Sequence, residues 1–141
     1  MANKAAEIAR KYFDSINFNY TVTGDDGEAL RAAFELKNRT DLDLMIIFDP
    51  TANSCAIRSF GIAKIKEGTE DKIYALCNRL NAQFRWVKFT LIDGTRTIVA
   101  SDDLLLEEKT IGEETFSHCM QMAHIIDEAY PEIMQTIWGG N

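Results

Sequence analysis

The feature that most constrains the fold of this chain is a pair of alternating segments on either side of Asp93-Gly94. Residues 85–101 are rich in β-branched and aromatic side chains both before and after that dipeptide. Asp-Gly between two alternating apolar runs is the strongest short-range signal for a β-hairpin, because both residues tolerate a positive φ. The sequence therefore predicts two adjacent antiparallel strands joined at Asp93-Gly94.

A two-residue loop at Asp93-Gly94 would also fix how the two strands pair. Phe89 would lie opposite Ile98, on a face that is mostly apolar. The opposite face would end at Trp86, an aromatic residue of the kind that anchors binding surfaces; the alternative is that it packs under the preceding loop. We expect Asp102-Asp103 and the leucines that follow to leave the sheet.

Helical periodicity and strand-like alternation account for the rest of the chain. Helices are predicted over residues 3–17, 69–82 and 112–138, and strands over 18–22, 30–37, 42–49 and 54–65. Asn3 is a candidate helix cap, Gly61 a candidate bulge, and Pro131 should either kink the last helix or begin a short terminal one. The order α-β-β-β-β-α-β-β-α predicts an α+β fold, an antiparallel sheet with helices packed on one face, which would leave the other face open.

Length and composition indicate one globular domain over residues 1–141. Hydrophobic residues make up 46% of the chain and charged residues 26%, as in an ordinary soluble domain. The longest strongly apolar run, residues 44–48, is far too short to cross a bilayer, so we expect no membrane partner. Cys55, Cys77 and Cys119 are odd in number and widely spaced, which favours a reducing, cytoplasmic location over a disulfide framework.

The net charge of −7 is unevenly distributed. From Asp102 onward there are nine acidic residues and one basic residue, and the preceding part is close to neutral. An acidic segment repels the nucleic acid backbone, so a nucleic-acid role for Arg31, Arg58 and Lys88 is disfavoured. With Trp86, these three residues could instead share the open face as a candidate surface for an acidic or extended partner. The alternative is that they are ordinary solubilising charges.

The last predicted helix has a wider apolar arc than one core contact requires. One stripe at helical spacing contains Phe116, Cys119, Met120, Ala123, Ile126, Tyr130, Ile133 and Ile137. Met122, Ile125 and Ala129 widen it sideways, with His118 beside them. These four residues are a candidate dimer surface, because a two-fold dimer is the simplest way to bury the surplus. The alternative is a deep groove between the sheet and the first helix that buries both stripes.

The sequence contains no recognisable catalytic or cofactor motif. His118 and His124 are about 120° apart around a helix and lack metal-ligand spacing, so we expect no metal and no cofactor. The first hypothesis is therefore a non-enzymatic protein-binding module, dimeric and chaperone-like or regulatory, whose partners are itself and an unidentified protein or peptide. The alternative is a small enzyme with an unrecognised active site that uses Asp49, His118 or Cys55.

Several segments of the chain resemble a bacterial family, the YbjN-like domains. The resemblance covers roughly residues 3–138 and rests on segment 5–20, on the hairpin segments 86–92 and 96–100, on segment 102–105 and on the closing helix with Glu113, Phe116 and Tyr130-Pro131. Members are labelled sensory transduction regulators, and their fold is similar to that of type III secretion chaperones. The resemblance implies a layered α-β-α-type fold, a homodimer in many relatives and no established catalytic residues. Because the sequence shows no secretion context, the cargo-binding role of those chaperones does not follow.

Overall fold

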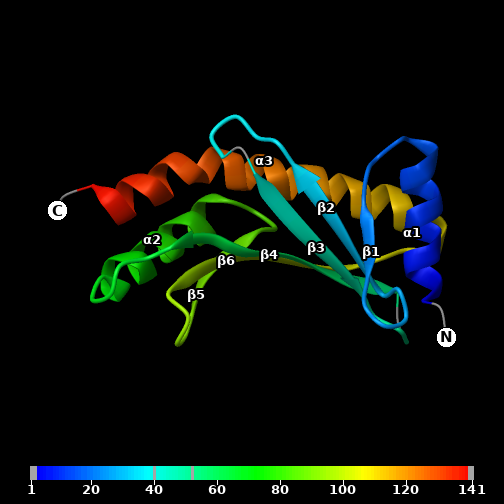
Figure 1. Ribbon diagram of the computed structural model, residues 1–141, viewed down its shortest axis with the longest axis horizontal. Coiled ribbons are helices and arrows are strands. Elements are labelled where there is room, and N and C mark those ends of the chain that lie inside the picture. Colours follow the sequence, from blue (N-terminus) through cyan, green and yellow to red (C-terminus); the bar gives the residue numbers. More distant parts are fainter. Residues whose placement is uncertain (1–2, 40, 52, 140–141) are drawn as a thin grey trace.

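A computed structural model describes residues 3–39, 41–51 and 53–139 of this chain. It contains a six-stranded antiparallel sheet, in the order β1-β2-β3-β4-β6-β5, backed by helices (Figure 1). The elements are α1 (Lys4–Ser15), β1 (Thr21–Thr23), β2 (Ala29–Phe34), β3 (Leu42–Phe48), β4 (Ser54–Lys64), α2 (Glu70–Gln83), β5 (Lys88–Ile92), β6 (Thr97–Leu105), the 3-10 helix η1 (Glu108–Thr110) and α3 (Ile111–Trp138). The predicted α+β class and the predicted order of helices and strands are confirmed.

The first helix begins at a side-chain cap that also ties it to the sheet. The Oδ1 atom of Asn3 accepts a hydrogen bond of 3.0 Å from the backbone amide of Ala6, as the predicted cap requires. Its Nδ2 atom donates to the backbone oxygen of Phe48, 3.2 Å away at the end of β3. The helix then buries Ala5, Ala6, Ala9 and Phe13 in the core. One polar residue therefore fixes both the start of α1 and its position against the sheet.

The long helix α3 extends along most of the molecule, with β2 and β3 in front of it in Figure 1. It packs against α1, α2, β4 and β6. The approach to α1 is close at Gly112, where an added Cβ would lie 2.3 Å from the Cβ atom of Tyr12. The helix continues through Pro131 to Trp138, so a separate terminal helix does not form. Among the described residues, no helix combines the length and apolarity that a membrane span requires.

Residues from all three helices and the sheet share one hydrophobic core, and this core includes most of the candidate dimer surface. The side chains of Met122, Ile125 and Ala129 are 0%, 7% and 2% exposed. They are therefore unavailable to a second subunit, and the prediction of a dimer surface there is wrong. The alternative interpretation explains the wide apolar arc, because α1, α2 and the sheet cover α3 from several sides.

The predicted β5–β6 hairpin is present, but its register differs by two residues. Ile92 pairs with Thr97, so the loop has four residues where two were expected. The backbone amide and the hydroxyl of Thr95 both donate to the backbone oxygen of Ile92, at 3.1 and 2.7 Å, and Arg96 adopts a φ of 54°. Because a shift of two residues keeps each side chain on its own face, Phe89 is buried as predicted.

The pairing of β6 with β4 corrects a second expectation. Asp102 does not lead the chain out of the sheet, because β6 continues to Leu105 and stays paired with β4. Its side chain lies on the buried face of that strand and is 4% exposed.

The predicted bulge is confirmed: the pairing of β4 with β6 shifts between Ser59 and Ala63, and Gly61 lies inside this interval with a φ of 73°.

Candidate binding surface on the open face of the sheet

The face of the sheet opposite the helices contains one continuous row of cross-strand partners. Arg31 pairs with Met45, and Met45 with Arg58. Arg58 in turn pairs with Ser101, and Ser101 with Lys88. Side chains of directly paired residues lie on the same face of a sheet. The three basic residues therefore share the open face, as the alternation predicts, and we call this surface the open face below.

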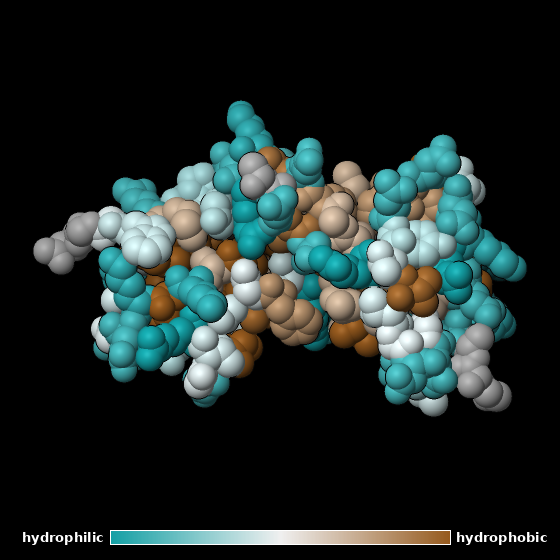
Figure 2. Space-filling model, in the orientation of Figure 1, coloured by the Kyte–Doolittle hydropathy of each residue, from teal (hydrophilic) through white to brown (hydrophobic). Residues whose placement is uncertain are grey.

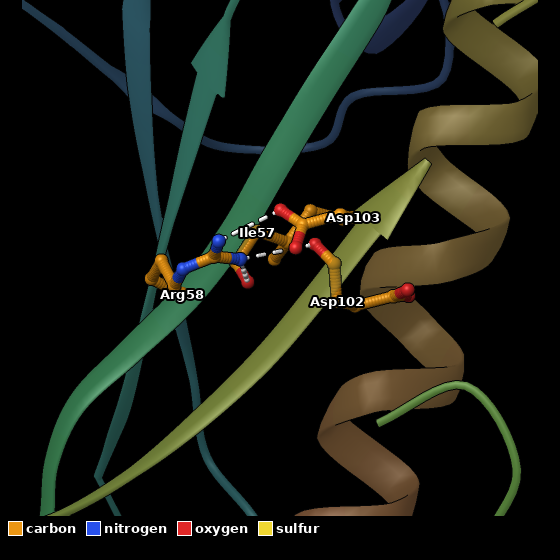
Figure 3. Close-up of polar contacts among 4 residues, drawn as sticks. All are labelled: Ile57, Arg58, Asp102 and Asp103. Atoms are coloured by element: carbon orange, nitrogen blue, oxygen red, sulfur yellow. Dashed lines mark hydrogen bonds and ion pairs between the residues drawn. The ribbon is translucent and has the colours of Figure 1, made fainter. Parts of the chain in front are cut away.

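Arg58 lies at the centre of this row and is held by β6. Its guanidinium donates to a carboxylate oxygen of Asp103 at 2.7 Å. It also donates to the backbone oxygens of Ile57 and Asp102, at 3.1 and 3.3 Å. Figure 3 shows Arg58 and Asp103 turned toward each other, whereas the Asp102 side chain points toward α3. Adjacent residues of β6 thus place one carboxylate on each face of the sheet.

The other two basic side chains of the row also have partners within the chain. Arg31 forms an ion pair of 2.6 Å with Asp43. The ammonium group of Lys88 donates to the backbone oxygens of Asn81 and Phe84, at 3.0 and 3.1 Å, near the end of α2. A cation in that position satisfies carbonyl groups that the helix leaves without partners. The open face is therefore electrically mixed and does not form a positive patch.

Apolar side chains with solvent exposure lie between these polar groups. Ile47, Phe60 and Leu105 are 37%, 64% and 85% exposed, and Met45 and Ala56 are partly buried. Figure 2, in which β2 and β3 lie in front of α3, shows brown and tan atoms among teal groups across the middle of the molecule. Exposed apolar surface with a polar rim is typical of protein interaction sites.

One end of the open face is hollowed into a pocket of about 460 Å³, which we call the end pocket. It is lined by Ile47, Phe48, Asp49, Pro50, Ser54, Cys55, Ala56, Asp103, Leu104 and Leu105. Most of these residues are apolar, and Leu105, the last residue of β6, is on the pocket wall although most of its side chain is exposed. A smaller hollow of about 180 Å³ is lined by Arg31, Asp43, Leu44, Met45, Arg58 and Phe60.

The β5 edge of the sheet is blocked by a side chain of α2. The amide nitrogen of Asn81 donates to the backbone oxygen of Phe89 at 3.0 Å, and its Oδ1 atom accepts from the backbone amide of Phe89 at 2.7 Å. This pair of bonds replaces the contacts that another strand would make, which is one way that proteins protect an edge. The opposite edge strand, β1, has only three residues. The open face is consequently more available to a partner than the sheet edges are.

Trp86, a candidate residue of the partner surface, does not lie on the open face. It has a φ of 73° and precedes β5, so strand alternation does not extend to it. Its ring lies edge-on to the ring of His118, with 6.0 Å between centroids, on the side of α3. The side chain is 54% exposed. The predicted position is wrong because a positive φ turns the chain before the strand begins.

His118 is paired with a carboxylate that the sequence pattern did not identify. Its Nδ1 atom lies 2.8 Å from the Oδ2 atom of Asp102. Burial raises the pKa of Asp102, and the hydrogen bond to His118 opposes that rise. The pair was missed because Asp102 was expected to leave the sheet. The sequence did contain a signal for this pair. Asp102 follows Ala100 at the spacing of two that keeps a residue on the same face of a strand, and His118 lies 16 residues after it.

The three residues of the enzyme alternative do not form a common site. Burial raises the pKa of the Cys55 thiol to about 12, so that it stays protonated at neutral pH. Asp49 accepts hydrogen bonds from the amide and the hydroxyl of Thr51, at 2.8 and 2.9 Å, within a turn. Among the described residues, the end pocket includes Asp49 and Cys55 but not His118. Groups of three or more His, Cys, Asp or Glu side chains that could hold a metal ion do not occur within the described ranges.

Comparisons with known proteins agree with this architecture. The crystal structure of YbjN from E. coli, described there as "a putative transcription regulator", matches with a TM-score of 0.62 and 16% identity, over 90% of this chain and 92% of that one. At this identity the match shows the fold alone. No curated protein matches the chain. The model of the YbjN family, described as "Putative bacterial sensory transduction regulator", matches residues 6–135. The predicted resemblance is confirmed, and the chain belongs to the YbjN family.

Proposed function

We propose that this chain is a non-enzymatic, regulatory protein-binding module and that its open face is the surface that contacts other proteins. The observation that carries the proposal is the exposure of Ile47, Phe60 and Leu105 on a sheet face that lies opposite the helices. Apolar side chains grouped in this way are costly to leave in water and are commonly covered by a partner. The family description as a regulator gives loose support to a binding or regulatory role.

Two other candidate surfaces, the wide apolar arc of α3 and the β5 edge, are less available for such a contact. The apolar residues that widen the arc of α3 are buried within the chain. The side chain of Asn81 covers the β5 edge. A partner that lies across the open face would cover apolar surface without competing with these internal contacts. The proposed partners are a second copy of the chain and another protein, and a chaperone-like role stays part of the proposal.

Absence of catalysis and a cytoplasmic location are also parts of the proposal. The protonated thiol of Cys55 would be a poor nucleophile, which makes the enzyme alternative less favourable. Cys55, Cys77 and Cys119 are all buried and unpaired, as suits a reducing compartment. The mixed charge of the open face, together with a net charge of −7, disfavours nucleic acid as the partner.

Capture of partners from native lysate, followed by mass spectrometry, tests this proposal. Phe60→Glu places a charge on the open face at a residue that is 64% exposed. Tyr74→Glu is the matched control, because Tyr74 is a 49% exposed aromatic residue on α2. We expect specific partners to be lost with Phe60→Glu and retained with Tyr74→Glu. Retention of every partner by Phe60→Glu would contradict the proposal.

A further inference from the structure

We propose that the end pocket holds a large apolar side chain of another protein, and that a lysine or arginine beside that residue pairs with Asp49 and Asp103. This inference rests on the proposed function, because the end pocket belongs to the open face. It goes further by naming the chemistry that the partner must present, which is a bulky apolar residue with a cation next to it in the same segment.

The end pocket has the size and the lining of a site for one apolar side chain. Its volume is about 460 Å³, and most of its lining residues are apolar. Ile47, Ala56 and Asp103 pair in a row across β3, β4 and β6, and Leu105 follows Asp103 on the same face of β6. The pocket therefore combines an apolar floor with a carboxylate at the end of the row.

The exposure of Leu105 indicates that the occupant is part of a larger molecule. The side chain is 85% exposed although it belongs to the pocket wall. Pockets for small molecules usually enclose about 70–90% of the ligand's surface, and a wall that is mostly in water does not enclose a ligand in this way. A protein whose side chain enters the pocket would cover Leu105 with its neighbouring residues, as happens around the anchor residues of interfaces.

Charge at this end of the molecule favours a basic partner. Figure 1 shows the turn between β1 and β2 beside the end of β3, where the backbone amide of Phe48 donates to the backbone oxygen of Glu28 at 2.9 Å. The segments that meet at this end, 24–28, 49–51 and 103–107, contain no basic residue. Their acidic residues are Asp25, Asp26, Glu28, Asp49, Asp103 and Glu107. Such an excess of one sign attracts a partner of the opposite sign.

Two of these carboxylates are placed to contact the partner's cation. Asp49 and Asp103 line the end pocket, both are exposed, and none of the described residues that line it is basic. Asp103 accepts one hydrogen bond from Arg58, and a carboxylate can accept several. A cation next to the inserted apolar residue would therefore find acceptors at the pocket wall. A second copy of the chain would bring the same acidic segments to this end, so charge favours a different protein.

Selection from a random library of short peptides displayed on phage tests the chemistry of the partner. The wild type is the bait, and Ala56→Phe, whose ring should fill the pocket, removes peptides that bind elsewhere. We expect enrichment of peptides in which Leu, Ile, Phe or Trp is adjacent to Lys or Arg or one residue away from it. Enrichment of acidic peptides, of peptides without a large apolar residue, or of none that distinguishes the two baits would overturn the proposal.

Calorimetric titration of one enriched peptide measures the apolar contact. Filling the pocket with Ala56→Phe should weaken binding by roughly ten- to a hundredfold, the value of burying one large apolar side chain. Leu105→Ser removes part of the wall at an exposed position and should weaken binding as well, so it tests the pocket even if urea unfolding shows that Ala56→Phe is unstable. Tyr74→Ser, at an exposed aromatic residue of α2, is the control. Binding by Leu105→Ser equal to that of Tyr74→Ser would contradict a contact in the pocket.

A double-mutant cycle tests the ion pair separately. Asp49→Asn removes the charge and keeps an oxygen that can accept from Thr51. It should weaken binding of the enriched peptide by about two- to fivefold, and it should not affect the same peptide with Gln in place of its cation. Asp71→Asn removes an equal charge from an exposed position on α2 and should change neither affinity. Equal effects of Asp49→Asn on the two peptides would contradict the proposed pairing.

These results can be separated from a failure of the proposed function. If no peptide depends on the pocket and the partners captured from lysate are lost with Phe60→Glu, the inference fails and the proposed function remains. If peptides depend on the pocket and the captured partners are unaffected by Phe60→Glu, the inference is supported, and the result counts against the rest of the open face as a contact surface.

Discussion

The side-chain amide of Asn38 donates a hydrogen bond of 3.0 Å to the backbone oxygen of Asp127, the helical acceptor four residues before Pro131. Proline has no amide hydrogen and cannot make this helical bond itself. The Asp127 carboxylate in turn accepts from the backbone amides of Asn38 and Arg39, at 2.6 and 3.3 Å. The loop between β2 and β3 thus compensates for a proline inside α3.

We expect Asn38→Ala to lower the free energy of unfolding by about 1 kcal/mol, because the Asp127 carbonyl loses this partner. The cost should be smaller in a Pro131→Ala background, in which an amide at position 131 can supply the helical bond. Urea unfolding of the two single variants and the double variant measures the coupling. Equal costs in both backgrounds would show that Asn38 does not compensate for Pro131.

The close contact between α1 and α3 predicts that Gly112→Ala lowers the free energy of unfolding, although alanine favours a helix. Gly112→Ala should gain up to about 1 kcal/mol from helix propensity. Its new methyl group, however, would lie 2.3 Å from the Cβ atom and 2.7 Å from the Cγ atom of Tyr12, so the two helices must separate. We expect overpacking to outweigh propensity and to lower the free energy of unfolding by about 1–3 kcal/mol.

Two controls accompany this measurement by urea unfolding. Ser117→Ala changes an exposed residue of the same helix and should have a small effect. Tyr12→Gly should reduce the additional cost of Gly112→Ala, because it removes the Cβ atom of Tyr12 together with the rest of the obstructing side chain. A stabilised Gly112→Ala variant would show that α1 and α3 do not pack closely at this point.

Asn81 should protect the sheet from pairing with other chains. Asn81→Ala removes two hydrogen bonds to the backbone of Phe89, so we expect a loss of about 1–3 kcal/mol in the free energy of unfolding. The exposed edge should also promote aggregation that increases with concentration, measured by light scattering. Asn78→Ala, at an exposed position on the same helix, should change neither property. Unchanged scattering by Asn81→Ala would count against this protective role.

The buried carboxyl group of Asp102 predicts a pH dependence of stability. Burial raises its pKa above the ordinary value of 3.8, against the opposing effect of His118. As the pH rises from that value to the higher folded pKa, the unfolded chain releases its proton first, so this group's contribution to the free energy of unfolding falls. Asp102→Asn should remove this decrease, as measured by urea unfolding at a series of acidic pH values.

The hydrogen bond between His118 and Asp102 should limit the pH range over which the free energy of unfolding decreases. His118→Ala removes the hydrogen bond that lowers the pKa of Asp102, so the loss of stability should continue to higher pH than in the wild type. His124→Ala is the control, because His124 lies on the same helix but is exposed and only 3.5 Å from Glu128. Identical pH profiles for the two histidine variants would contradict a role for His118 in lowering the pKa of Asp102.

Local patterns predicted the elements of this fold well because they depend on neighbours in sequence. The cap at Asn3 and the bulge at Gly61 are such local features, and both are present. The hairpin register was wrong because hydrogen bonds of Thr95 and the positive φ of Arg96 favour a longer loop. The Asp93-Gly94 dipeptide predicts neither the hydrogen bonds of Thr95 nor the positive φ of Arg96.

The candidate site was harder to predict because it depends on distant contacts. Helical periodicity placed Met122 on the apolar arc of the last helix. It did not show that α1, α2 and the sheet together cover that arc. Asp102 was misplaced because its partner, His118, belongs to another element. By contrast, strand alternation alone placed Arg31 and Arg58 on the open face.

The proposed function requires that proteins contact the open face and not the helical layer, and methyl NMR distinguishes these two surfaces. Two methionines report on the two sides: Met45 lies on the open face, and Met120 is 45% exposed on α3. When a partner captured from lysate is added to the labelled chain, we expect shifts for the methyl groups of Met45, Ile47 and Leu105 and none for Met120. Shifts confined to Met120 would contradict it.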